Sequence, residues 1–252
     1  LLFHNCPEQR TLLITHSNAA LNDLFEKIMQ RDVPHRYMLR LGMGEEDLDT
    51  SVRFSRQGRV DAMLARRIEL LAEVDRVAAS LELGEAAGAG YTCETAAHFW
   101  LIHVKARWER YLRALAKARE AGGRGAEGQE GTMAAQLFPF ARYFVERRQQ
   151  GQQQEAQQQG QVQAQGPAQQ VGGQQATQQE LGAGGALFDG TSEASDLAAA
   201  EVFFARLRAM FEELEECRPF ELLKTQRDRS DHLMTRQARI VAMTCTHAAL
   251  KR

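Results

Sequence analysis

The feature that most constrains the fold of this chain is a glutamine-rich block in its second half. From residue 149 to residue 179 there are 17 glutamines in 31 residues, with no Phe, Leu, Ile, Trp or Tyr among them. Such a segment cannot bury enough apolar surface to offset the conformational entropy that ordering would cost. We therefore predict a disordered loop over residues 148–190, and the packed structure must come from the segments on either side of it.

Composition and charge exclude several classes of protein. The 252 residues are 44% hydrophobic and 25% charged, which suffices for one globular domain with an appendage. The 31 Lys and Arg residues are balanced by 33 Asp and Glu residues, so no overall positive field attracts nucleic acid or an anionic membrane, and any such binding must be local. We expect a soluble chain without a membrane partner, because no apolar run approaches the roughly 18 residues of a membrane span.

The four cysteines and the two ends of the chain add two expectations. The cysteines, at positions 6, 93, 217 and 245, fit neither a CxxC metal site nor a dense disulfide scaffold, which indicates a reduced, intracellular chain. Residue 1 is Leu rather than Met, and the final THAALKR stops where a new helix should be starting. We therefore expect an internal piece of a larger protein.

Apolar patterns at the two ends predict a parallel α/β sheet. Residues 11–15 (TLLIT) form a short apolar, β-branched run typical of a strand covered on both faces. An apolar stripe over residues 21–29 predicts a helix directly after it, and residues 37–41 and 239–244 predict two further strands. The order of strand, helix, strand, long helical excursion and strand indicates an α/β domain with an insertion.

The excursion is predicted to contain four helices. The first covers residues 59–81, and the second begins near Thr92 and buries one aromatic and apolar face. The third runs from residue 195 to residue 217, where Pro219 should break it, and a shorter helix follows over residues 220–237. The apolar positions expected on the first two helices are Val60, Leu64, Ile68, Leu71, Val74 and Val77, then Trp100, Val104, Trp108, Tyr111 and Leu115.

Two turns far apart in the sequence share one layout. ITHSNAAL at residues 14–21 and MTCTHAAL at residues 243–250 each end a strand, place hydroxyl residues in the turn and open a helix with small residues. Helix N-termini expose unpaired N–H groups, and hydroxyls beside them add hydrogen-bond donors. Side by side at the carboxyl edge of a parallel sheet, two such turns could hold consecutive phosphates of one strand. Hydroxyl residues are also the preferred N-caps, so capping without a ligand remains the alternative.

Other candidate sites carry weaker signals. Gly42-Met43-Gly44 follows a strand, but the acidic residues 45–47 would repel the phosphates of a dinucleotide. His98 and His103 are five apart on one helix, whereas a metal pair would be spaced i, i+4, so packing or surface positions are favoured. The basic helix face either meets RNA or is a solvated face, and it comprises Lys105, Arg107, Arg110, Arg113 and Lys117.

The two turns carry a resemblance to a known family. TLLITHSNAALNDLFEKI resembles motif Ia of the superfamily 1 nucleic-acid helicases, the branch that includes the nonsense-mediated-decay helicase, and ARIVAMTCTHAAL resembles the strand and turn before their motif II. Blocks such as RLGMGEEDLDT, YTCETAAHF, FPFARYF and LLKTQRDRSDHL extend the similarity, in order, to spliceosomal members of the family. The resemblance implies a partial RecA-like parallel-sheet motor domain interrupted by a long helical insertion.

The same resemblance divides the chain into five segments. It implies a first part of the motor domain over residues 1–44, a helical insertion over 45–147, the glutamine- and glycine-rich loop over 148–190, a continued insertion over 191–237, and the motor strand and turn before motif II over 238–252.

The resemblance also implies a function. It points to an ATP-dependent RNA helicase of the nucleus that acts in pre-mRNA splicing, with intron RNA, pre-mRNA and spliceosomal proteins as partners. The family's P-loop and acidic motif II would fall outside this chain, which contains no GxxxxGK[ST], so ATP and Mg²⁺ are expected in the full-length protein and no cofactor on this fragment alone. The implied RNA-binding residues are Thr15, Ser17, Asn18, Thr244, Thr246 and His247.

Two alternatives stay open at this stage. In the first, the motor has decayed and the long helices serve as a non-catalytic scaffold that binds spliceosomal proteins. In the second, a helicase of the same superfamily acts on other RNA or on DNA. An upstream P-loop and a downstream acidic strand in the coding sequence would favour the motor over the scaffold.

Overall fold

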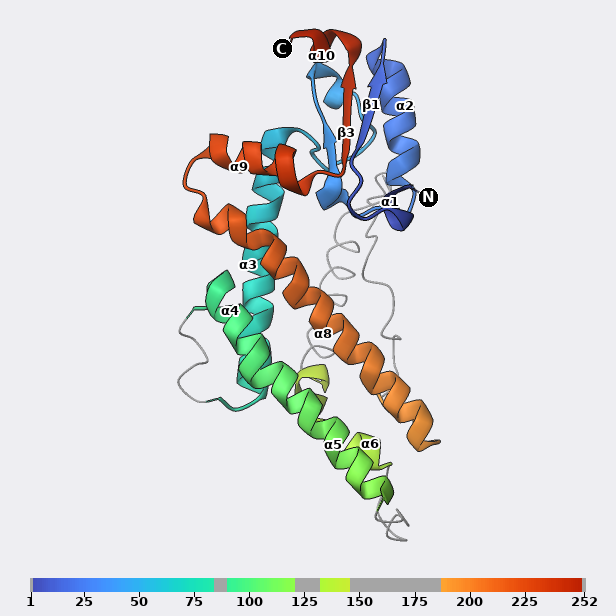
Figure 1. The fold of residues 1–252 in the computed structure, drawn as a ribbon, viewed down its shortest axis with the longest axis vertical. Coiled ribbons are helices and arrows are strands. Elements are labelled where there is room, and N and C mark those ends of the chain that lie inside the picture. The colour runs from blue at the N-terminus through green and yellow to red at the C-terminus, as the bar shows by residue number, and fades with distance from the viewer. Residues whose placement is uncertain (1, 84–89, 121–131, 146–186, 251–252) are drawn as a thin grey trace, which may run out of the picture. The chain divides into compact units, whose positions relative to one another are not determined.

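The computed structural model describes residues 2–83, 90–120, 132–145 and 187–250. Most of the predicted glutamine-rich loop therefore lies outside the described residues. The chain forms two compact units: residues 1–68 with 217–252, here called the sheet unit, and residues 69–216, the helical unit. Two long helices, α3 (Arg56–Ser80) and α8 (Glu193–Leu222), each run continuously from one unit into the other (Figure 1).

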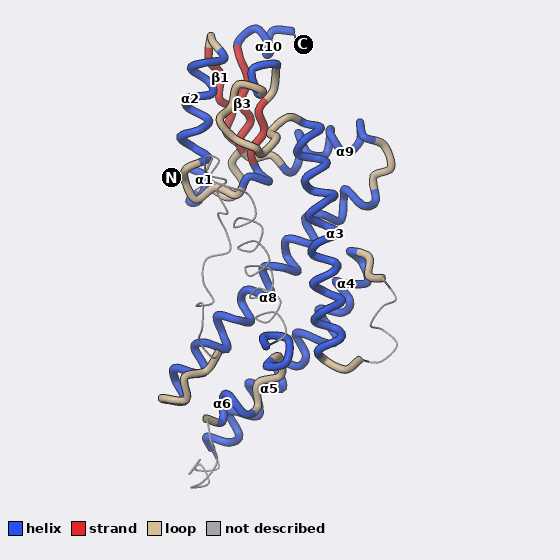
Figure 2. The backbone as a smooth tube through the Cα atoms, turned by 180° about the vertical axis from the view of Figure 1, so that it is seen from behind, coloured by secondary structure: helices blue, strands red, loops and turns tan. Residues whose placement is uncertain are grey.

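The sheet unit is built on three parallel strands in the order β1-β3-β2. Strand β1 spans Thr11–Thr15, β2 spans Met38–Arg40 and β3 spans Ile240–Thr244, which confirms the three strands predicted from the sequence. The last strand of the chain lies between the first two, so residues from opposite ends of the sequence are direct neighbours (Figure 2). This topology supports the predicted mixed α/β class.

Helix α2 (Asn18–Met29) covers one face of the sheet, as its apolar stripe predicted. Leu21 and Phe25 are fully buried and pack in one core with residues of β2 and β3. Phe54 belongs to the same core, with its ring in an edge-to-face contact with Phe25 at 5.0 Å between centroids. Phe54 therefore belongs to the core of the sheet unit.

The other face of β1 is open within the described part of the chain. Leu12 is 56% exposed and Ile14 is 48% exposed, whereas Leu13 between them packs toward the core. The expectation of a strand covered on both faces is therefore wrong for β1 in these residues. Strand alternation explains the pattern, because residues two apart share a face and only one face of β1 lies against α2.

The sheet unit also contains several short helices and helical turns. They are α1 (Leu2–Asn5), the 3₁₀ turns η1 (His35–Tyr37) and η2 (Met43–Glu45), α9 (Gln226–His232), the π-helical turn η5 (Leu233–Gln237) and α10 (Cys245–Leu250). The Arg10 guanidinium donates to the carbonyls of Met234, Thr235 and Ala238, so it satisfies the acceptors left open where η5 ends.

The predicted break at Pro219 does not occur. Helix α8 continues through Pro219 to Leu222, and the Pro219 carbonyl accepts a hydrogen bond from the Leu223 N–H at 2.9 Å. Proline lacks the N–H that would bond to the carbonyl four residues earlier, so α8 loses one hydrogen bond at Pro219 yet continues to Leu222. The predicted helix over residues 220–237 is consequently shorter and begins at α9, where the Thr225 hydroxyl accepts from the Asp228 N–H as N-cap.

In the helical unit, three consecutive helical segments form one continuous run with an aromatic face. It comprises α4 (Cys93–Phe99), the π-helical η4 (Trp100–Lys105) and α5 (Ala106–Glu120). It starts at the predicted position, with Thr92 as N-cap, and the structure adds a capping box between Thr92 and Thr95. The Trp108 and Phe204 rings stack with centroids 4.3 Å apart and an interplanar angle of 7°. A short helix, α6 (Met133–Gln136), joins this cluster through the Tyr111 hydroxyl, which donates to the Ala134 carbonyl.

The apolar stripe predicted on α3 is wrong at one position. Ile68 is 62% exposed, whereas the buried positions of α3 include Val60, Met63, Leu70 and Val74. Two successive steps of four residues carry Ile68 about 80° around the axis from Val60, because each residue of an α-helix turns about 100°. Within the described residues, no helix combines the length and the apolar character needed to cross a membrane.

Candidate nucleic-acid interface

The two hydroxyl-lined turns begin from neighbouring strand ends. Strand β1 pairs with β3 in parallel, and Thr15 stands opposite Thr244 in the register. The turn at residues 15–18 and the turn at residues 244–247 therefore leave the same carboxyl edge of the sheet. The prediction that these distant segments become neighbours is confirmed.

In the first turn, the hydroxyls shape the start of α2. The Ser17 Oγ is the N-cap and accepts from the Ala20 N–H at 3.2 Å, as the capping alternative predicted. The Thr15 hydroxyl donates to the Ser17 carbonyl at 2.8 Å, so its proton is used within the turn. Ser17 is exposed, and its own hydroxyl proton is not needed for capping because the capping oxygen acts as acceptor.

In the second turn, Thr244 stabilises the backbone and Thr246 is exposed to solvent. The Thr244 Oγ1 accepts from the His247 N–H at 3.3 Å and thereby holds the first turn of α10. Thr246 is exposed, and its hydroxyl forms no hydrogen bond with any described residue. The half-buried His247 ring packs over Gly42: a Cβ placed on Gly42 would lie 3.4 Å from His247 Nδ1. The loop after β2 thus meets the same edge as the other two turns.

A buried arginine that the sequence interpretation did not single out connects the loop after β2 to α2. Arg40, the last residue of β2, is fully buried. Its Nε donates to Asn22 Oδ1 at 3.1 Å, its Nη2 donates to Asn18 Oδ1 at 2.9 Å, and its Nη1 donates to the Leu41 carbonyl. The one available signal was a cationic residue within the apolar run of β2.

Among the described residues, no carboxylate hydrogen-bonds to the charged side chain of Arg40. Burial lowers the pKa of Arg40, and the negative charges of Glu45 and Asp47 act in the opposite direction. Glu45 itself serves the start of α3, because its Oε1 accepts from the Phe54 N–H at 2.6 Å and the Ser55 N–H at 2.8 Å. A positive charge therefore lies beneath the carboxyl edge, and the described groups that accept its hydrogen bonds are neutral.

The last residues of the three strands do not offer a Mg²⁺ site. The strands end in Thr15, Arg40 and Thr244, which provide no carboxylate for a divalent cation. Across the described ranges, no group of three or more His, Cys, Asp or Glu side chains is placed to hold a metal ion.

The remaining sequence candidates lie in the helical unit. His98 is exposed, and His103 packs against Phe99 at 5.3 Å between ring centroids, which agrees with surface and packing positions. Burial lowers the pKa of His103, and the nearby Arg107 lowers it further. On the predicted basic face, Lys105 at the end of η4 and three cations of α5, Arg110, Arg113 and Lys117, are exposed, whereas Arg107 is half-buried.

Comparison with known proteins adds a relationship over the whole chain. A scan of protein-family models finds none that matches. RNA helicase aquarius from Mus musculus is 43% identical over 251 residues, which cover 100% of this chain and 14% of that protein. This chain is similar along its entire length to one segment of RNA helicase aquarius. The resemblance predicted from the motif blocks is thereby confirmed.

A second relative is more distant. The pre-mRNA-splicing factor cwf11 from Schizosaccharomyces pombe is 24% identical over 240 residues, which cover 95% of this chain and 15% of that protein. The chain thus spans about one seventh of the length of either relative. The aquarius similarity includes the two hydroxyl-lined turns, since it covers the full chain.

Proposed function

We propose that this chain is a segment of an ATP-dependent RNA helicase acting in pre-mRNA splicing, and that its sheet unit is part of a RecA-like motor domain. The carboxyl edge of the sheet would contact the backbone of intron RNA. The observation that carries the proposal is the pairing of β1 with β3, which brings the turns after Thr15 and Thr244 together. The similarity to RNA helicase aquarius and to the splicing factor cwf11 supports the process.

The chemistry of this edge suits the sugar-phosphate backbone better than the bases. It offers the exposed hydroxyls of Ser17 and Thr246 and the free N–H groups at the start of α2, and these match phosphate oxygens. Neither turn contains a Phe, Tyr or Trp ring that could stack on a base. A contact set of this kind carries no sequence information, as a helicase that acts on any strand requires.

The test combines Ser17→Ala with Thr246→Ala in the full-length protein. Losing two backbone contacts should weaken RNA binding by about tenfold or more and lower RNA-stimulated ATPase activity, because each net hydrogen bond is worth about 1 kcal/mol. Titration of labelled single-stranded RNA and a steady-state ATPase assay measure the two effects. Unchanged values in both assays would reject the assignment.

Two further variants separate ligand binding from capping. Ser17→Asp keeps an N-cap of equal quality but places a negative charge against the phosphate, so it should leave stability intact and weaken RNA binding. Thr225→Ala removes a matched N-cap hydroxyl at the start of α9, so it should lower stability and leave RNA affinity unchanged. If Ser17→Asp binds RNA normally, the Ser17 hydroxyl serves capping alone.

A protein-interaction role of the helical unit is a second candidate, because two adjacent apolar residues are exposed there. Leu101 is 54% exposed and Ile102 is 63% exposed, both within the π-helical η4. Such turns often occur at functional sites, and exposed apolar side chains suit a protein surface better than RNA. Leu101→Ser with Ile102→Ser should reduce co-purification of splicing proteins without changing RNA affinity. Retained co-purification would exclude this surface.

A further inference from the structure

The geometry around Arg40 determines which atom of Asn18 is available to a ligand. The Arg40 guanidinium carries donors and no acceptor, so the atom of Asn18 that faces it, at 2.9 Å, must be Oδ1. The planar amide of Asn18 then directs Nδ2, which carries two hydrogens, away from Arg40. Asn18 is exposed, and Nδ2 has no acceptor among the described residues.

The loop after β2 holds the Asn18 side chain from a second side. A Cβ placed on Gly44 would lie 2.4 Å from Asn18 Cγ and 2.7 Å from its Oδ1, so the glycine backbone packs directly on the amide. The Gly44 carbonyl accepts from Asn22 Nδ2 at 2.7 Å, and Asn22 Oδ1 accepts from Arg40. Arg40, Asn22 and Gly44 thus form one buried arrangement against which the amide of Asn18 lies.

Resting on the proposed RNA contact, we propose that Arg40 is a positioning residue that presents Asn18 Nδ2 outward as a hydrogen-bond donor to a phosphate or ribose oxygen of the RNA backbone. The buried charge of Arg40 adds a positive potential behind that donor, in a region of low dielectric. The acceptor is identified by its chemistry, because Nδ2 can donate and cannot accept. Donors on the ligand, such as exocyclic amines, find no partner at this atom.

Comparison of Asn with Asp at position 18 separates this role from a structural one. A carboxylate would pair with the buried Arg40 more strongly than an amide oxygen does. It would also interact favourably with the positive end of the α2 dipole. If position 18 mattered only for packing and stability, Asp would therefore stabilise the fold more than Asn does. An amide is required only where the outward atom must donate and the group must stay neutral toward a phosphate.

The first experiment uses Asn18→Asp and Asn18→Ala in the full-length protein. Asn18→Asp should match or exceed the wild type in resistance to urea, yet bind single-stranded RNA about tenfold or more weakly. Asn18→Ala should also bind RNA more weakly, without the added negative charge. RNA affinity that is unchanged in both variants, or that follows their stability, would overturn the inference.

The second experiment tests whether Arg40 affects RNA binding by positioning the Asn18 side chain. Arg40→Lys keeps the charge but loses the fork that reaches both Asn22 and Asn18. It should weaken RNA binding in the wild type and have no further effect in the Asn18→Ala background, as measured by a double-mutant cycle. A full additional loss in that background would show that Arg40 does not act through Asn18.

The failures of the two proposals are distinguishable. If Ser17→Ala with Thr246→Ala weakens RNA binding while every Asn18 variant binds normally, the positioning role is rejected and the RNA-binding edge stands. If none of these variants changes RNA affinity, the edge itself is not the RNA site.

Discussion

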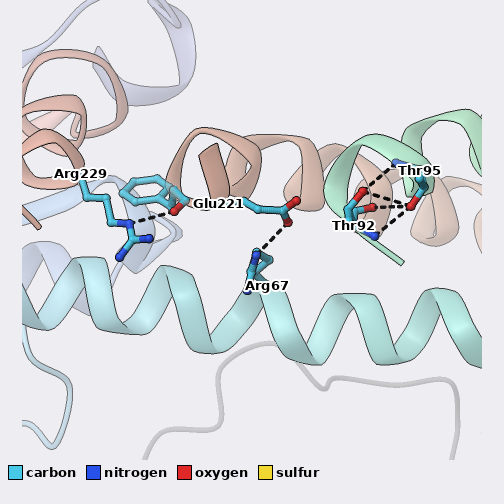
Figure 3. Close-up of polar contacts among 6 residues, drawn as sticks. Arg67, Thr92, Thr95, Glu221 and Arg229 are labelled. Atoms are coloured by element: carbon cyan, nitrogen blue, oxygen red, sulfur yellow. Dashed lines mark hydrogen bonds and ion pairs between the residues drawn. The ribbon is translucent and has the colours of Figure 1, made fainter. Parts of the chain in front are cut away.

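Arg67 of α3 and Glu221 of α8 form an ion pair, with 2.8 Å between Arg67 Nη1 and Glu221 Oε2 (Figure 3). Both residues belong to the sheet unit, and they tie the helix that leaves the sheet to the helix that returns to it. Their side chains are 24% and 19% exposed, so the pair is largely withdrawn from solvent. Close to it, the Arg229 Nε donates to the Phe220 carbonyl at 2.9 Å and joins α9 to the end of α8.

Breaking this ion pair from one side should destabilise the sheet unit. Glu221→Ala would leave the Arg67 guanidinium partly buried without this carboxylate, and we expect a loss of about 2 kcal/mol in the free energy of unfolding. Urea unfolding of the chain measures it. Arg67→Met with Glu221→Leu should recover part of the loss, because neither charge is then left alone. A double variant as unstable as Glu221→Ala would contradict this account.

We predict that the stacked Trp108 and Phe204 rings make a large contribution to the stability of the helical unit. Phe204 is 3% exposed, and Phe204→Ala should lower the free energy of unfolding by about 3–5 kcal/mol, since it removes a ring from a packed aromatic cluster. Val202→Ala on the same helix is the matched control, because Val202 is 53% exposed and should change stability by less than about 0.5 kcal/mol. Similar losses in the two variants would refute the assignment.

Gly42 has a backbone conformation that other residues rarely adopt. Its φ is 100° and its ψ is 172°, a region occupied almost solely by glycine. Gly42→Ala should cost about 1–3 kcal/mol, because alanine is strained at this φ even though its Cβ would make only an ordinary contact with His247. The neighbouring Met43 is 94% exposed, so Met43→Ala should leave the urea midpoint unchanged. Equal urea midpoints for Gly42→Ala and the wild type would show that alanine is not strained at this position.

Three histidines should make stability depend on mildly acidic pH. Burial, and to a smaller extent a nearby arginine, lowers the pKa of each below the ordinary 6.5, and the pairs are His35 with Arg59, His103 with Arg107 and His232 with Arg236. The unfolded chain then binds protons near pH 6.5 while the folded chain does not, so stability is present above that pH and falls as pH drops toward the lowered values.

Urea unfolding at pH 7.5 and pH 6.0 measures this dependence. We expect a lower midpoint at pH 6.0, and His35→Gln should reduce the difference between the two values. A midpoint that rises on acidification would contradict the direction of the shifts.

The sequence predicted much of the fold because local periodicity reports local structure. The three strands, α2 and the start of the aromatic helix at Thr92 were all apparent from apolar spacing and capping residues. The misplaced features, Ile68 and Pro219, depend on the exact rotation of a long helix and on how close a proline lies to a helix end. Neither is fixed by composition.

The candidate site was only partly accessible from sequence. The hydroxyl residues stood out because two similar turns each follow an apolar strand. Arg40 did not, because an arginine in a short strand gives no sign that it will be fully buried and bonded to Asn18 and Asn22. Its partners come from a different element, so the local pattern around it is uninformative.

The sequence by itself determined which segments can be strands, where helices begin, and that two turns carry hydroxyls, since each property depends on residues a few positions apart. The tertiary structure decided that β3 inserts between β1 and β2, and therefore that Thr15 and Thr244 lie together. It also decided which way the amide of Asn18 faces. The physical reason is that strand pairing and burial of a charge are settled by contacts between residues distant in the chain, whose free energies no local pattern contains.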